Sequence, residues 1–191
     1  FGAGLMAYTM YHVIDLHVPQ MLVVQEINQL FHLHLTHTAI HRLKSAATQR
    51  YQGTYAGILR KIVTGRLIHA DETPVSIGGK RAYVWVFTTL EDVIYYYTKT
   101  REGDFLHEML HGFKGVLVSD FYAAYDAMNC AQQKCLIHLM RDLHTDLLKQ
   151  PFNGELKALV HAFALLLKPI IETVDRFGLT AQHLQKHKPF V

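Results

Sequence analysis

The stretch of sequence that decides the fold is Leu67-Ile68-His69-Ala70-Asp71-Glu72-Thr73-Pro74. Its apolar residues lead into two adjacent carboxylates, and Thr73-Pro74 is expected to end the segment. This order predicts a buried strand that carries an acidic residue at its own C-terminal end. A second copy of the arrangement is Gly115-Val116-Leu117-Val118-Ser119-Asp120, another apolar strand that ends on an aspartate.

Carboxylates on the ends of two strands indicate a shared divalent-metal site. Hard cations such as Mg²⁺ take oxygen ligands, usually one or two protein carboxylates beside several waters. A pair of ions about 3.5–4 Å apart can activate the attacking oxygen and stabilise the leaving oxygen of a phosphodiester. Asp71 and Asp120 are the candidate ligands, and Glu72 should point away from Asp71 if the strand geometry persists. The alternative is that Asp71 only starts a turn and Asp120 only caps a helix.

The composition limits the classes of protein to consider. A chain of 191 residues, half hydrophobic and 18% charged, can bury a sizeable core and is not of the disordered class. A net charge of +3 is compatible with a polyanionic partner. Two cysteines give no disulfide framework and favour a reducing cytoplasm. No signal peptide and no apolar run of about 18 residues are present, so no membrane partner is expected. Because the chain begins with Phe1, we expect a fragment of a longer protein.

Residues 1–50 predict a helical region that resembles a helix-turn-helix. Breaks are expected before Pro19 and over residues 32–35, and Thr36 is a suitable N-cap for the third helix. In a helix-turn-helix the second helix of the motif enters the major groove of DNA. The polar face of the third helix would supply the DNA-binding residues Thr38, His41, Arg42 and Lys44. The alternative is a helical hairpin that only packs against the rest of the chain.

The remaining chain predicts an α/β core followed by more helices. Residues 51–65 form a connecting helix, and residues 66–150 contain strands over 66–70, 82–89 and 93–98 that should make an antiparallel meander. Further elements are a short helix after Asp104, a strand over 116–119, a helix over 122–128 and a strand over 133–136. This order is that of a ribonuclease H-like core, in which strands one and four are neighbours. Residues 151–191 form a truncated helical insertion, with helices opening at Asn153 and Pro169.

Cys135-Leu136-Ile137-His138 has the spacing C-x-x-H. A structural zinc site would need two more ligands, and Cys130, His144 and His161 do not stand at a convincing spacing. The favoured interpretation is a buried cysteine at the end of a strand, with a histidine near a cleft.

Four motifs, in order, resemble those of bacterial transposases of the insertion sequence 66 family. Residues 69–75 resemble the first catalytic motif, residues 82–86 the second strand, residues 118–125 the second aspartate motif, and residues 134–142 the Cys-x-x-His block. Asp15-Leu16-His17-Val18-Pro19 resembles the start of the family's helix-turn-helix. The likeness spans most of residues 1–178.

The resemblance implies a DDE transposase with a ribonuclease H-like catalytic domain. Such enzymes use two Mg²⁺ ions, or Mn²⁺, to cleave a DNA strand at the transposon end, and the freed 3′-hydroxyl then attacks target DNA. Asp71 and Asp120 become the first two catalytic and metal-binding acids, with Glu72, Cys135 and His138 near the site. The implied partners are double-stranded DNA, as transposon ends and target, and further copies of the chain. The implied location is the bacterial cytoplasm, at the nucleoid when DNA is bound.

One element of the family pattern is not matched. The third acid, a glutamate, follows a long helical insertion, and Glu155 and Glu172 suit ordinary helix positions better. We expect that glutamate beyond Val191, so this chain alone should be inactive. Two alternatives stay open: another ribonuclease H-like nuclease or integrase, and a non-catalytic DNA-binding remnant of a transposase.

Overall fold

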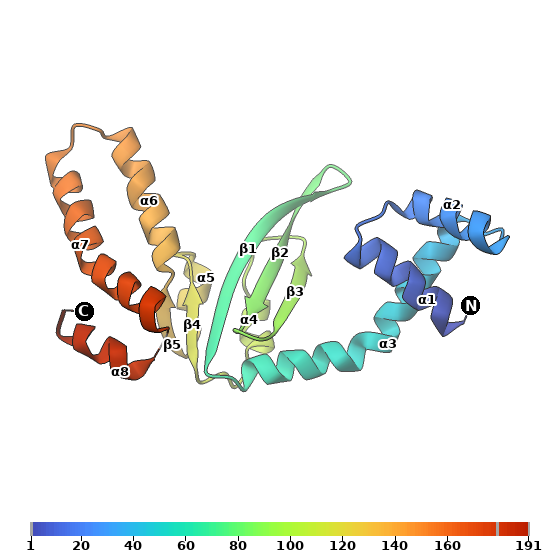
Figure 1. The fold of residues 1–191 in the computed structure, drawn as a ribbon, viewed down its shortest axis with the longest axis horizontal. Helices are drawn as coiled ribbons and strands as arrows, with labels where there is room; N and C mark the ends of the chain where they lie inside the picture. Colours follow the sequence, from blue (N-terminus) through green and yellow to red (C-terminus); the bar gives the residue numbers. More distant parts are fainter. Residues whose placement is uncertain (1, 179, 191) are drawn as a thin grey trace. The chain divides into compact units, whose positions relative to one another are not determined.

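The computed structural model describes residues 2–178 and 180–190 and divides into two compact units. The first unit comprises Phe1–Val118 and Ala123–Gln132, and the second comprises Ser119–Tyr122 and Gln133–Val191. Phe1, Leu179 and Val191 belong to the predicted helical regions but lie outside the described residues. Figure 1 shows the elements in chain order.

The first unit opens with the predicted helices. They are α1 (Ala3–Met10), which continues as the π-helical turn η1 (Tyr11–Asp15), α2 (Gln20–Phe31) and α3 (His37–Val63). The break between α2 and α3 is made by His32, whose φ of 50° is left-handed and ends the helix. Thr36 occupies the N-cap position of α3, although its side chain makes no capping hydrogen bond.

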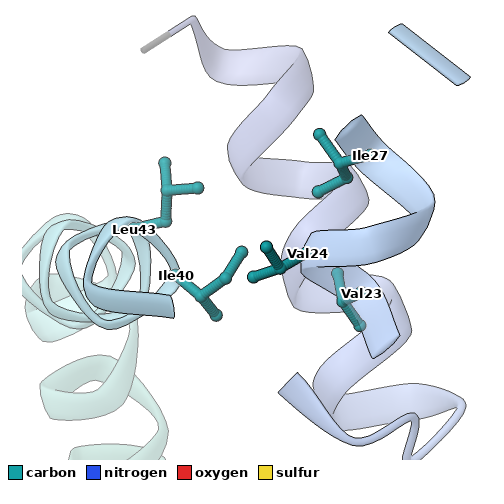
Figure 2. Close-up of a cluster of buried hydrophobic side chains, with 5 residues drawn as sticks. All are labelled: Val23, Val24, Ile27, Ile40 and Leu43. Atoms are coloured by element: carbon teal, nitrogen blue, oxygen red, sulfur yellow. The ribbon is translucent and has the colours of Figure 1, made fainter. Parts of the chain in front are cut away.

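A compact apolar cluster joins α2 to α3 (Figure 2). Its members are fully or almost fully buried and follow helical spacing: Val23, Val24, Ile27, Ile40 and Leu43. The turn between the helices is fastened twice by Asn28, whose Nδ2 donates to the Leu35 carbonyl at 3.0 Å and whose Oδ1 accepts from the Leu35 amide at 2.8 Å. Apolar packing and these two bonds together hold the helix–turn–helix arrangement.

Helix α3 corrects one expectation. It runs without a break from His37 to Val63, so the connecting helix expected over 51–65 is the second half of α3. Gly53 and Gly57 lie within it, and each costs only about 1 kcal/mol relative to alanine. That cost is too small to end a helix whose two halves are both anchored. The second half is held to the sheet by Tyr55, whose hydroxyl donates to the Tyr95 carbonyl at 3.2 Å.

The sheet is mixed and five-stranded, which makes the chain an α/β protein. Its strands are β1 (Leu67–Ile77), β2 (Lys80–Thr88), β3 (Val93–Thr98), β4 (Val116–Ser119) and β5 (Ala131–Lys134), in the order β3-β2-β1-β4-β5. The expected antiparallel meander of β1, β2 and β3 is present. Strands one and four are neighbours, as expected, and pair in parallel from Leu67↔Val116 to His69↔Val118.

Strand β1 does not stop at Thr73-Pro74 as expected, so the acidic pair lies within the strand and not at its end. The strand continues to Ile77, with Pro74 paired to Tyr83 of β2. It then turns at Gly78-Gly79, whose φ values of 57° and 76° suit glycine in a two-residue hairpin. Proline is tolerated where a strand forms an edge, and the pairing of β1 with β4 reaches only to His69.

One face of the sheet carries the core of the first unit. Trp85 and Phe87 are fully buried there, and the ring of Phe105 meets Trp85 edge-on with a centroid separation of 5.0 Å. Phe105 opens the short helix α4 (Phe105–Met109). Tyr125, from α5 (Ala123–Asp126), is also fully buried and meets Trp85 at 5.9 Å. Aromatic packing therefore fixes β2 against α4 and α5.

The second unit is mainly helical. Its helices are α6 (Leu136–Lys149), α7 (Gly154–Phe177), α8 (Ala181–Leu184) and the 3₁₀ helix η2 (Gln185–Phe190). Asn153 caps α7 as predicted, accepting from the Leu156 amide at 3.0 Å. Among the described residues, no helix is both long and apolar enough to cross a membrane.

Pro169 does not open a new helix as expected, because it lies inside α7. A proline in a helix interior costs about 3 kcal/mol. The helix nevertheless continues, because buried residues stand on both sides of the proline, at Leu167 and Thr173. The Thr173 hydroxyl also donates to the Pro169 carbonyl at 2.7 Å. The end of α7 at Phe177, before Gly178, is as predicted.

Candidate active site

Asp71 projects from β1 shortly after its pairing with β4 ends. It pairs with Val86 of β2, and its side chain is exposed. Its Oδ1 accepts a hydrogen bond from the Glu72 amide at 2.9 Å. Because β1 is hydrogen-bonded to β2 along this length, the backbone that carries Asp71 is held on a regular strand.

Glu72 is the next residue and has a different environment. It pairs with Trp85, the centre of the buried face, and its side chain is only 2% exposed. Its Oε1 accepts from Arg101 Nε at 2.8 Å and Nη2 at 2.5 Å, and its Oε2 accepts from the Tyr125 hydroxyl at 2.7 Å. A buried carboxylate is costly unless it is paired and hydrogen-bonded, and here both oxygens are engaged. Glu72 therefore ties β1 to α5 and to the segment that follows β3.

Sequence reasoning missed both partners of Glu72. Tyr125 stands within the second aspartate motif, where only its spacing was noted, and it meets Glu72 across 53 residues of sequence. Arg101 lies 29 residues from Glu72 and belongs to no recognisable motif. The motif offered a signal for Tyr125, and none existed for Arg101.

Asp120 comes directly after β4, as predicted. It is half-buried, and its Oδ1 accepts from the Tyr122 amide at 2.9 Å, just before α5. Its backbone carbonyl accepts from Lys134 Nζ at 3.1 Å. The bond from the Tyr122 amide forms a turn that ends at Tyr122, before α5, and is not the helix cap considered as the alternative. It does not exhaust the side chain, since a carboxylate has about four acceptor positions.

An acidic triad is present in the chain. Asp71, Glu72 and Asp120 each offer a carboxylate oxygen of a kind that could hold a metal ion. An all-oxygen donor set fits hard cations such as Mg²⁺ and Mn²⁺ and does not fit soft metals.

The Cys-x-x-His block joins no group of possible metal ligands among the described residues. Cys135 comes directly before α6, and its amide donates to the Ser119 carbonyl at 2.7 Å. His138 lies in the first turn of α6. Cys130 is partly buried, and desolvation raises the pKa of its thiol. The expectation of a buried cysteine at the end of a strand is thus met in position only, because Cys135 directly follows β5 but is only partly buried.

The predicted DNA-binding residues lie in the first half of α3. Thr38, His41 and Arg42 are exposed and Lys44 is half-buried, while Ile40 and Leu43 point into the apolar cluster. Contact of these residues with DNA stays a prediction. The two glutamates set aside as the third acid lie on exposed positions of α7, and Glu172 pairs with Lys168 at 4.0 Å.

The fold and the acidic triad define a class: an α/β protein that carries candidate metal-binding carboxylates on β1 and directly after β4. The chain belongs to the transposase IS66 family, whose family model matches residues 1–185. Among solved structures, it is similar to the HTLV-2 integrase catalytic core domain in complex with magnesium (trimeric form). The identity is 14% and the TM-score 0.31, over 51% of this chain and 80% of that chain. No curated protein matches the chain.

Proposed function

We propose that the chain belongs to a DDE-type DNA transposase with a ribonuclease H-like core. It acts on double-stranded DNA, cleaving a strand at transposon ends and joining it to target DNA, and it works as a homo-oligomer. Asp71 and Asp120 are the catalytic acids that hold divalent metal ions. Membership of the transposase IS66 family supports this reaction class.

The observation that carries the proposal is the register of β1 with β4. His69 pairs with Val118, and each aspartate follows that pair by two residues in sequence (71 − 69 and 120 − 118), Asp71 within β1 and Asp120 directly after β4. At about 3.3 Å per residue in parallel strands, both acids are expected about 7 Å past the same pair. From equal offsets on parallel neighbours we expect both side chains on the same side of the sheet, which supports a shared site.

The chain's own part in the reaction is to place its carboxylates. Bound Mg²⁺ or Mn²⁺ would supply the positive charge that activates an attacking oxygen and stabilises a leaving oxygen. Asp71 is held by the pairing of β1 with β2 and by the anchored Glu72 beside it. Asp120 is held by its bond from the Tyr122 amide. A site fixed on strands keeps the ligands near one geometry without a rearrangement at each turnover.

The test is strand cleavage by full-length protein carrying Asp71→Asn or Asp120→Asn. Each change keeps the size of the side chain and removes a charged oxygen ligand, so cleavage with Mg²⁺ should fall at least about a hundredfold. Mn²⁺ affinity, measured by calorimetry on the present chain, should fall in parallel. Asp104→Asn is the control, because Asp104 is exposed and makes no capping bond.

The outcomes separate the rival functions. Wild-type cleavage rates in both variants would refute the catalytic assignment. Strand hydrolysis by the wild type without any joining to target DNA would indicate a nuclease of related fold. DNA binding without cleavage by the full-length wild type would indicate a non-catalytic remnant.

A further inference from the structure

A pocket lined by basic side chains lies at the N-terminal ends of β1 and β4. Its volume is about 790 Å³, and Arg60, Arg66, His111 and Lys114 line it. Arg66 comes directly before β1, and Lys114 lies two residues before β4. The pocket therefore stands at the N-terminal ends of β1 and β4, whereas Asp71 lies further along β1. Among the described residues, no acidic side chain lines it.

The positive charge of this pocket is not balanced within the part of the chain that the structure describes. None of its four basic residues forms an ion pair there, although each is exposed and able to do so. Lys61, next to Arg60, differs in this respect. Its ammonium is bound by Asp92 at 2.7 Å and by Glu91 at 3.1 Å, and it does not line the pocket.

A cation in the last turn of a helix can be explained by the helix dipole alone. That account covers Arg60, which lies in the last turn of α3. It does not cover Arg66 and Lys114, which come from two other segments and line the same pocket. Basic side chains from three segments therefore converge on one pocket. Together with the pocket's volume, this arrangement suits an anion larger than one phosphate.

Helix α3 is itself acid-free. Its 27 residues contain Arg42, Lys44, Arg50, Arg60 and Lys61, and no aspartate or glutamate. Arg42 and Arg60 are 18 residues apart (60 − 42), which is five turns of 3.6 residues, so they project from the same side about 27 Å apart along the axis. The positions between them on that side are small or uncharged and exposed: Ala46, Gln49, Gly53 and Ala56. A polyanion can follow this side without meeting a like charge or a bulky group.

We propose that the pocket of Arg60, Arg66, His111 and Lys114 binds backbone phosphates of DNA, as a second contact remote from the catalytic acids and continuous with Arg42 along α3. The inference takes DNA as the partner from the proposed function and adds where its backbone is held. Arginine and lysine bind phosphate oxygens directly, and such contacts position a duplex without reading its sequence.

The test is the binding of a fluorescent random-sequence duplex to the chain, measured by polarisation in EDTA over a range of salt. Each phosphate contact contributes about 0.9 to the slope of log K against log salt. Arg60→Gln or Lys114→Gln should each lower that slope by about 0.9. Relative to 1 M salt, affinity at about 0.1 M should then fall about eightfold for each variant and about sixtyfold for the double variant.

Lys61→Gln is the matched control, because it removes the same charge from the adjacent position outside the pocket. It should weaken binding less than about twofold, since its ammonium is already paired and salt screens its field. Equal losses in Lys61→Gln and Arg60→Gln would reduce the effect to general charge and overturn the proposal. Unchanged duplex binding by the double variant Arg60→Gln/Lys114→Gln would also overturn the proposal. This holds even if the double variant loses binding to poly-glutamate, because the pocket would then bind another polyanion and not DNA.

The test does not depend on catalysis. The assay contains EDTA, so duplex binding is measured without bound metal and without strand cleavage. Failure of the cleavage experiment would therefore not affect the result on duplex binding. Failure of the duplex-binding experiment would likewise not affect the result on cleavage. Circular dichroism of each variant checks that the helical content is retained.

Discussion

Tyr125→Phe isolates the contribution of the hydrogen bond to the buried Glu72 carboxylate. The change removes the hydroxyl, which donates to Glu72 Oε2 at 2.7 Å, and keeps the ring that meets Trp85 edge-on. Hydrogen bonds to charged groups contribute about 1.5–3 kcal/mol, and the glutamate side chain is only 2% exposed, so water cannot readily replace the donor. We expect the free energy of unfolding to fall by about 1.5–3 kcal/mol.

The assay is urea unfolding followed by the fluorescence of Trp85, the single tryptophan of the chain. Because Trp85 is fully buried beside Tyr125, its emission reports on the sheet. With a slope of about 2 kcal/mol per molar urea, the midpoint should shift down by about 1 M. In a Glu72→Gln background the same change should cost only about 0.5–1.5 kcal/mol, because the lost bond is then between neutral groups.

Tyr97→Phe is the control, since Tyr97 is half exposed and lies opposite Val84 on the other face of the sheet. It should change the free energy of unfolding by less than about 0.5 kcal/mol. The reasoning is refuted if Tyr125→Phe also stays within about 0.5 kcal/mol of the wild type.

Four further outcomes follow from packing and burial. Ile40→Ala should cost about 2–5 kcal/mol and melt the α2–α3 cluster, seen as lost amide protection in hydrogen exchange, because Ile40 is fully buried. Gly57→Ala should raise the free energy of unfolding by about 1 kcal/mol, since no atom lies within 4 Å of the added methyl group. Gly115→Ala should lower the melting temperature, because its methyl group would meet the Arg66 carbonyl. At pH 8, Cys130 should react with iodoacetamide more slowly than a free thiol, and its rate profile should rise at higher pH, because burial raises its pKa; equal rates would contradict this.

Local sequence signals were sufficient to predict the elements whose formation depends on a few neighbouring residues. The strands at Val93–Thr98 and Val116–Ser119, the turn at Gly78-Gly79 and the cap at Asn153 are where their residues predict them. Each follows from alternation, left-handed glycine or a capping side chain, all of which act over a few residues.

Several boundaries differ from the expected ones, and two of them fell at prolines whose local preference was overridden. The strand expected over 133–136 lies instead at Ala131–Lys134. Pro74 does not end β1, because the pairing of β1 with β2 continues past it. Pro169 does not end α7, because buried residues of the helix stand both before and after it. The break expected between residues 50 and 51 is absent, because α3 runs from His37 to Val63. Tertiary contacts of this kind cannot be read from a window of sequence.

The candidate site likewise has features that the sequence predicts and features that it does not. Asp71 and Asp120 are candidates because each follows an apolar run in the sequence, and their role in a site stays a prediction. The anchoring of Glu72 was not, since it depends on Arg101 and Tyr125, which only the folded chain brings together. The register that gives both aspartates equal offsets likewise depends on β1 finding β4 across the sequence.

The continuation of β1 through Pro74 also bears on solubility. Among the described residues, β1 beyond His69 is paired on the β2 side alone. A strand with one unpaired side can add the strand of another molecule, the first step of edge-to-edge aggregation. Pro74, exposed and without an N–H, interrupts the row of donors that such a strand would need. Pro74 is therefore better understood as a residue that hinders pairing on the side of β1 facing away from β2 than as the end of the strand.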